Sequence, residues 1–288
     1  MASTERTLIG SLFMVDLEGP LRRRCGWLAA QSAGFTLVAF SIPRTLQLDF
    51  PGLISVFLLA ASLRDPLVGL LDENRDRIWA QEEPAPVVNR TTSFSVLALF
   101  LGAFSGYLLI SQWLLPQSLE STFGVVLDAA SVPPDGSLLQ HDHFGSMSSI
   151  LGHNLSVMVG IFAISTVYRA YGAMLVLSWN AAVWATVLSV LGTRAVESVS
   201  ASGLVAVAGA AVGILPHLTA EALGFCIAAT GAIFGSVGLS KYGLGDPRLR
   251  RVMLAVGKLM LVAVGLLTVA AALEARYAPW VFGLLKTM

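Results

Sequence analysis

The chain has 288 residues, of which 55% are hydrophobic and only 12% are charged, and its mean hydropathy is +0.74. Because soluble domains carry about 25% charged residues, this composition excludes an ordinary soluble protein and predicts a multi-pass protein of the cell membrane. The 18 basic and 18 acidic residues balance, so no overall field favours nucleic acid as a partner.

The first 90 residues form an N-terminal region with two hydrophobic segments. A spanning helix needs about 20 apolar residues. Residues 26–46 satisfy this length, whereas residues 51–71 are interrupted by Arg64, Asp65 and Pro66. The two segments therefore either span the bilayer or form a short hairpin at its surface.

Residues 91–288 form the second predicted region, a transmembrane domain. Its clearest spanning candidates are residues 93–115, 172–193, 219–240 and 252–273. Residues 150–168 are acceptably apolar, whereas residues 201–215 are short for a full span. The predicted fold class is an all-α transmembrane bundle with about six or seven membrane segments.

The distribution of lysine and arginine predicts which loops lie inside. Residues 116–148 contain no basic residue, so this loop is expected outside the cytoplasm. The loop from Lys241 to Arg251 is basic and is expected inside, but a full span at residues 201–215 would place it outside. We therefore predict a re-entrant or broken helix near residues 201–217.

His217 and Glu221 are the strongest candidate site residues. They lie four apart in an apolar run, so a helix places both on one face. A charge at bilayer depth costs at least ~2.5 kcal/mol, which makes such residues functional candidates. Three roles remain open: a structural hydrogen-bonded pair, a proton or cation site, or a surface that recognises another transmembrane helix.

Other polar residues complete the candidate site. Asn154 and Asn180 would cap helices or hydrogen-bond between them, with binding as the alternative. Glu274 is expected to anchor the last helix at the interface beside Arg276. His153 precedes Asn154 and belongs to the same polar group.

A metal site is a weaker hypothesis. His141 and His143 flank Asp142 in the long outer loop, and two ligands there would need His153, His217 or Glu221 to complete a site. A solvated loop is the simpler interpretation. No nucleotide-binding glycine motif or two-histidine protease box occurs, so neither a cofactor nor enzymatic activity is expected.

Pairs of glycines recur at a spacing that allows close helix contacts: Gly102 with Gly106, Gly209 with Gly213, and Gly231 with Gly235. Such pairs let two helix backbones approach each other. They predict packing within one bundle, and a homo-oligomer contact is the alternative.

Several short motifs appear in a recognisable order. They are Gly106-Tyr107, His153-Asn154, Trp179-Asn180, the box Pro216-His217-Leu218-Thr219-Ala220-Glu221, and Ala271 to Ala275 before Pro279. In this order the chain resembles the stage II sporulation protein M family of integral membrane proteins. The resemblance covers about residues 93–285, and the box around His217 is its most specific part.

The chain departs from the family pattern at three places. Leu218 and Ala181 replace glycines, and no proline follows Glu221. The resemblance implies a non-enzymatic membrane scaffold that organises other membrane or envelope proteins during envelope remodelling. The alternative is a permease-like transporter or ion-binding subunit that uses the helix break at His217 and Glu221.

Overall fold

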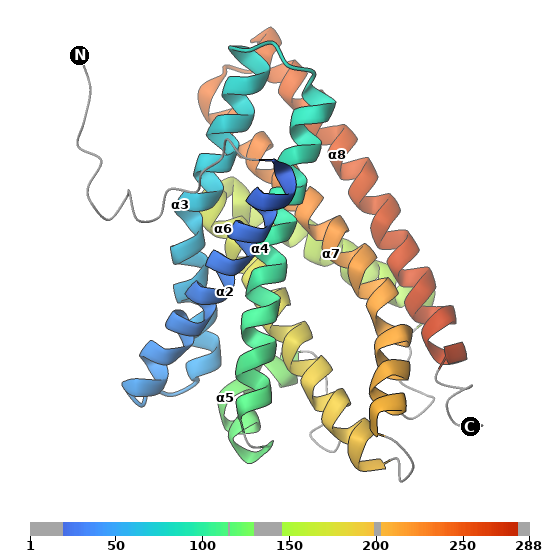
Figure 1. Cartoon of the computed structure of the whole chain (residues 1–288). Coiled ribbons are helices and arrows are strands. Elements are labelled where there is room, and N and C mark those ends of the chain that lie inside the picture. Colours follow the sequence, from blue (N-terminus) through green and yellow to red (C-terminus); the bar gives the residue numbers. More distant parts are fainter. Residues whose placement is uncertain (1–19, 115, 130–145, 199–202, 282–288) are drawn as a thin grey trace.

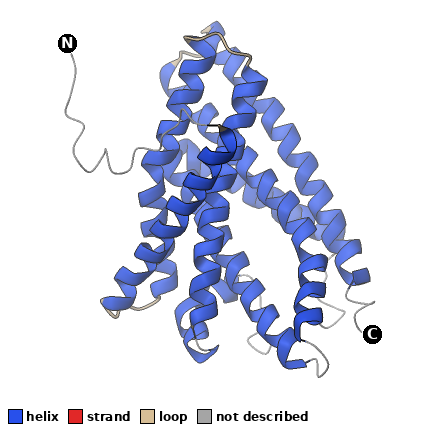
Figure 2. Ribbon diagram, viewed as in Figure 1, coloured by secondary structure: helices blue, strands red, loops and turns tan. Residues whose placement is uncertain are grey.

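All described secondary structure is helical. The computed structural model describes residues 20–114, 116–129, 146–198 and 203–281, and Figure 2 shows helices connected by short loops in these ranges. Six of the helical segments are long and apolar enough to cross a membrane. The all-α membrane bundle predicted from the sequence is therefore confirmed.

The N-terminal segments are two long helices, α2 (Leu21–Thr45) and α3 (Pro51–Trp79), followed by α4 (Ala85–Trp113). Both α2 and α3 have the length and hydropathy of membrane spans, which favours spanning helices over a surface hairpin. Their buried side chains, such as Leu28 and Val56, share one hydrophobic core with Ala181 of a later helix. The region before residue 90 therefore packs as part of the bundle.

Part of the predicted outer loop is a helix, α5 (Pro116–Ala129). Phe123 is fully buried and lies 6.2 Å from the ring of Tyr107 and 6.1 Å from that of Phe40, measured between ring centroids. This aromatic contact explains why the segment folds back onto the bundle. Residues 130–145 of the loop lie outside the described residues.

Helix α6 (Met147–Ser198) consists of two arms that meet at Arg169. Arg169 has non-helical dihedrals (φ 54°, ψ −130°), and this break coincides with the predicted boundary between segments 150–168 and 172–193. Gly172 lies directly against the backbone of Ile164, where an added Cβ would be 2.6 Å from the carbonyl oxygen. The corner therefore requires a glycine after the break.

The predicted re-entrant segment near residues 201–217 is wrong. Helix α7 (Gly203–Lys241) continues through Pro216, and Figure 1 shows it as a bent but unbroken ribbon. Its 39 residues extend about 58 Å, so the short apolar stretch and the following segment are parts of one long helix. A proline removes one backbone hydrogen bond, and a helix packed among neighbours tolerates that loss.

The last helix, α8 (Pro247–Ala272), continues into a π-helical turn, η2 (Leu273–Tyr277). The α7–α8 connection lies at the same end of the bundle as the α3–α4 connection (Figure 1). This end, which we call the basic end, carries Arg75, Arg77, Lys241, Arg250 and Arg251. The basic loops therefore share one end as their charge predicted, without a re-entrant segment.

Ion pairs join the helices at the basic end. Arg24 of α2 donates two hydrogen bonds to Glu73 of α3, at 2.8 and 2.6 Å. Arg77 of α3 donates two hydrogen bonds to Glu83 in the following connection, at 2.7 and 2.6 Å. The hydrogen bond from Arg77 lowers the pKa of the Glu83 carboxyl below its ordinary value. Because Arg24 is only 4% exposed, its charge depends on Glu73 for compensation.

The contact between α2 and α4 depends on two glycines. A side chain at Gly102 would collide with the carbonyl of Ala29, and one at Gly106 would lie 2.6 Å from Cβ of Thr36. The close approach allows the Ser32 hydroxyl to donate a 2.6 Å hydrogen bond to the carbonyl of Leu99. The pair Gly102 and Gly106 therefore mediates packing within the bundle, which was the first of the two roles predicted for such glycine pairs.

We expect Gly102→Ala to lower the free energy of unfolding by about 1–3 kcal/mol, because the methyl group forces α2 away from α4. Gly34→Ala is the matched control, since no atom lies within 4 Å of a Cβ at Gly34. The control should be neutral or stabilising by up to about 1 kcal/mol. Thermal unfolding in detergent measures both, and equal effects of the two changes would contradict the packing role of Gly102.

Candidate functional site

Helix α7 places His217 and Glu221 on one buried face, as their spacing predicts. Each residue is 8% exposed. The His217 ring lies against the carbonyl of Gly213 in the preceding turn, while its buried Nδ1 makes no hydrogen bond of standard geometry with any described residue. Within the described structure no hydrogen bond joins His217 to Glu221, so the two residues share a face without forming a bonded pair.

Among the described residues, the charged group that interacts with Glu221 is a second carboxyl, that of Glu274. Glu274 lies in the π-helical turn η2 and interacts electrostatically with Glu221 across the α7–α8 contact. No ion pair in the described ranges involves either carboxyl. The sequence instead predicted that Glu274 anchors the helix beside Arg276, whose side chain is exposed.

Glu274 is the second residue of the π-helical turn. A π turn adds a residue to the helical repeat and shifts the side chains after it around the helix axis, and such turns are frequent at functional sites. Glu274 is half-buried, next to the buried Ala270 and Ala271 of α8. The structure thus brings together two acids that lie 53 positions apart in the sequence.

The other predicted polar residues are dispersed. Asn180 donates a 2.8 Å hydrogen bond to the carbonyl of Val176 in its own helix, so it is neither a cap nor a link between helices. Asn154 is 2% exposed, and its Nδ2 has no hydrogen-bond partner among the described residues. The side chain of His153 is exposed on the first arm of α6.

The structure gives little support to a metal site. In the described part of the chain, no group of three or more histidine, cysteine, aspartate or glutamate residues could hold a metal ion. His141 and His143 lie outside the described residues. Within the described ranges, His217 and Glu221 thus have no third side chain to complete a zinc site.

The carboxylate pair and the basic end lie on opposite sides of the predicted hydrocarbon layer. Twenty residues of α7 separate Glu221 from Lys241, which corresponds to about 30 Å along the helix. A typical hydrocarbon core is also about 30 Å thick. With Lys241 at one boundary, Glu221 lies near the other.

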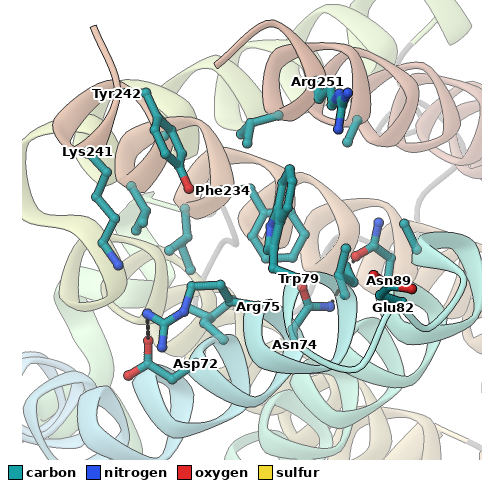
Figure 3. Close-up of a pocket in the computed structure, with 18 residues that line it drawn as sticks. Asp72, Asn74, Arg75, Trp79, Glu82, Asn89, Phe234, Lys241, Tyr242 and Arg251 are labelled. Atoms are coloured by element: carbon teal, nitrogen blue, oxygen red, sulfur yellow. Dashed lines mark hydrogen bonds and ion pairs between the residues drawn. The ribbon is translucent and has the colours of Figure 1, made fainter. Parts of the chain in front are cut away.

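A cavity at the basic end was not foreseen from the sequence. It has a volume of about 520 Å³ and lies between the ends of α3, α4, α7 and α8 (Figure 3). Trp79 and Tyr242 lie next to basic residues at helix ends, a combination typical of a membrane interface. This combination is the sequence signal that points to the position of the cavity. The sequence could not show that the ends of these four helices meet.

Comparison of the chain with protein-family models, curated proteins and solved structures finds no match. The resemblance to the sporulation protein M family therefore remains a prediction from the motifs around His217.

We expect Glu221→Gln to leave the protein folded and to raise its thermal unfolding midpoint at neutral pH. The amide has the same shape as the carboxyl but removes the repulsion between Glu221 and Glu274. Asp49→Asn, an exposed change in the α2–α3 connection, is the control and should have no effect. A large loss of stability in Glu221→Gln alone would contradict a repulsive pair.

Proposed function

We propose that the protein is an ion-coupled membrane transport protein in which the Glu221–Glu274 carboxylates bind and release a cation. The observation that supports this proposal is the pair itself: two carboxyls that interact electrostatically, one buried and one half-buried, without a basic partner among the described residues. Their charge must then be compensated by a bound proton or by an alkali cation.

A purely structural role explains this pair poorly. Buried acids that stabilise a fold are normally paired with a base or hydrogen-bonded to donors, as Glu73 is with Arg24. Neither a hydrogen bond nor an ion pair to Glu221 or Glu274 occurs in the described structure. Two acids held together at a net cost in free energy are typical of sites where a proton or ion is exchanged.

His217 would extend this site by one helical turn. It lies four residues before Glu221 on the same buried face, and Nδ1 is without a hydrogen-bond partner among the described residues. A neutral imidazole nitrogen can accept a hydrogen bond or a proton from a neighbouring group. We therefore propose that His217 assists proton exchange with the carboxylate pair.

A scaffold that organises partner proteins is the second candidate, as the sequence resemblance implies. The observation in its favour is the exposed apolar surface of α8 and of the first arm of α6, where Leu261 is 74% exposed and Val167 is 70% exposed. Lipid chains or the helix of another membrane protein would cover this surface. The two candidates make different predictions for the Glu221→Gln variant.

The transport proposal predicts that liposomes containing the protein respond to an imposed ion gradient. A dye sensitive to internal pH, read under a pH gradient or a sodium gradient, distinguishes a proton from an alkali cation. We expect Glu221→Gln and Glu274→Gln each to reduce the flux at least tenfold, and His217→Ala to reduce it less. The exposed change Asp49→Asn should retain the full flux.

The absence of flux under both gradients, in a folded protein, would overturn the transport proposal. The scaffold would then be favoured if Glu221→Gln also lost partner proteins that co-purify with the unchanged protein from membranes. Retention of those partners together with loss of flux supports transport. The two measurements therefore separate the candidates without depending on the identity of the substrate.

A further inference from the structure

The cavity at the basic end is a second candidate binding site, separate from the carboxylate pair. Four helix ends form its wall: the end of α3, the start of α4, the end of α7 and the start of α8 (Figure 3). Its volume of about 520 Å³ lies within the range of small-molecule binding sites. Its first lining residue on α7, Ile233, lies about 18 Å along the helix from Glu221.

The wall of the cavity changes from apolar to charged along the helix axes. On α7, Ile233 and Phe234 lie two turns deeper in the bundle than Lys241. On α3, which runs toward the same end, Leu71 lies one turn deeper than Arg75. Because α8 starts at this end, Arg251 precedes the deeper Ala255. A ligand that fits this wall has a polar head and an apolar tail.

The charges at the rim favour an anionic head. Arg75 is compensated by Asp72, at 2.7 Å, and by Asp76, at 3.0 Å. Lys241 and Arg251 form no ion pair or hydrogen bond with any described residue, and the remaining acid of the lining is Glu82. Among the described residues, the rim of the cavity therefore carries two basic side chains without an ion-pair partner, Lys241 and Arg251, and one acid without a partner, Glu82. The apolar half of the described wall carries no charged side chain.

The expected position of the cavity at the membrane interface agrees with a ligand that has an anionic head and an apolar tail. Trp79 and Tyr242 line the cavity, and such aromatic residues concentrate where hydrocarbon meets the lipid headgroups. Basic pockets between transmembrane helices at this level bind the headgroups of anionic lipids. A soluble phosphate compound would leave the apolar half of the wall without a partner.

We infer that this cavity binds an anionic phospholipid, with its phosphate at the rim that carries Lys241 and Arg251 and the upper part of an acyl chain against Ile233, Phe234 and Leu71. The inference does not depend on the proposed transport function, because the two sites share no residue. It identifies the lipid by its phosphate charge and its apolar tail.

Native mass spectrometry of the full-length protein in a neutral detergent tests the inference. Titration with dioleoylphosphatidylglycerol should give saturable binding of one lipid that dioleoylphosphatidylcholine and glycerol phosphate do not reproduce. We expect the double variant Lys241→Gln/Arg251→Gln to weaken this binding about tenfold to thirtyfold, since each basic residue near a lipid surface contributes about a tenfold factor or less.

The matched control is Arg248→Gln/Arg250→Gln, which removes the same charge from exposed positions of the same helix end that do not line the cavity. This control should bind phosphatidylglycerol within about twofold of the unchanged protein. Equal weakening in both double variants would overturn the inference, because it would indicate attraction to the whole basic surface. Binding of glycerol phosphate as tight as that of the lipid would also overturn it, because the apolar half would then contribute nothing.

Glu82→Gln gives a variant with an effect of the opposite sign. The residue is exposed in a connection between helices, so the change should leave the fold intact. Removal of the uncompensated acid should strengthen phosphatidylglycerol binding severalfold. Unchanged or weaker binding in this folded variant would contradict a phosphate at this rim.

Discussion

The bundle depends on one constraint: inside hydrocarbon, a polar group has no water and must find its partner within the protein. Many buried polar groups find a hydrogen-bond partner in their own helix, as Asn180 does in the carbonyl of Val176. Others find one across a close helix contact, as Ser32 does in the carbonyl of Leu99. Glu221 is an exception because it is buried and interacts with a second acid, Glu274, instead of a base.

Two departures from regular helix geometry position the polar residues. The break at Arg169 divides α6 into two arms. The first arm packs on the end of α7, where the Ser236 hydroxyl donates a hydrogen bond to the carbonyl of Thr166. The second arm packs on α4, where Trp184 contacts Phe100. The π turn at the end of α8 places Glu274 against α7. Irregular backbone thus occurs where the helices must meet at particular points, which is common at functional sites.

The long helix α7 connects two chemically different ends. Near one boundary of the predicted hydrocarbon layer it carries Glu221, and near the other it ends at Lys241 beside the amphipathic cavity. The proposed cation site and the proposed lipid site therefore lie at different levels along one helix.

The sequence by itself determined the helical membrane class, the basic end and the burial of His217 with Glu221, because hydropathy, charge distribution and a four-residue spacing depend only on local residues. It led to a wrong re-entrant segment because a proline and a short apolar run do not reveal that α7 is one long helix. Only the tertiary structure decided that Glu274 interacts with Glu221 and that four helix ends enclose a cavity. Both depend on contacts between distant helices, which packing and backbone irregularity determine.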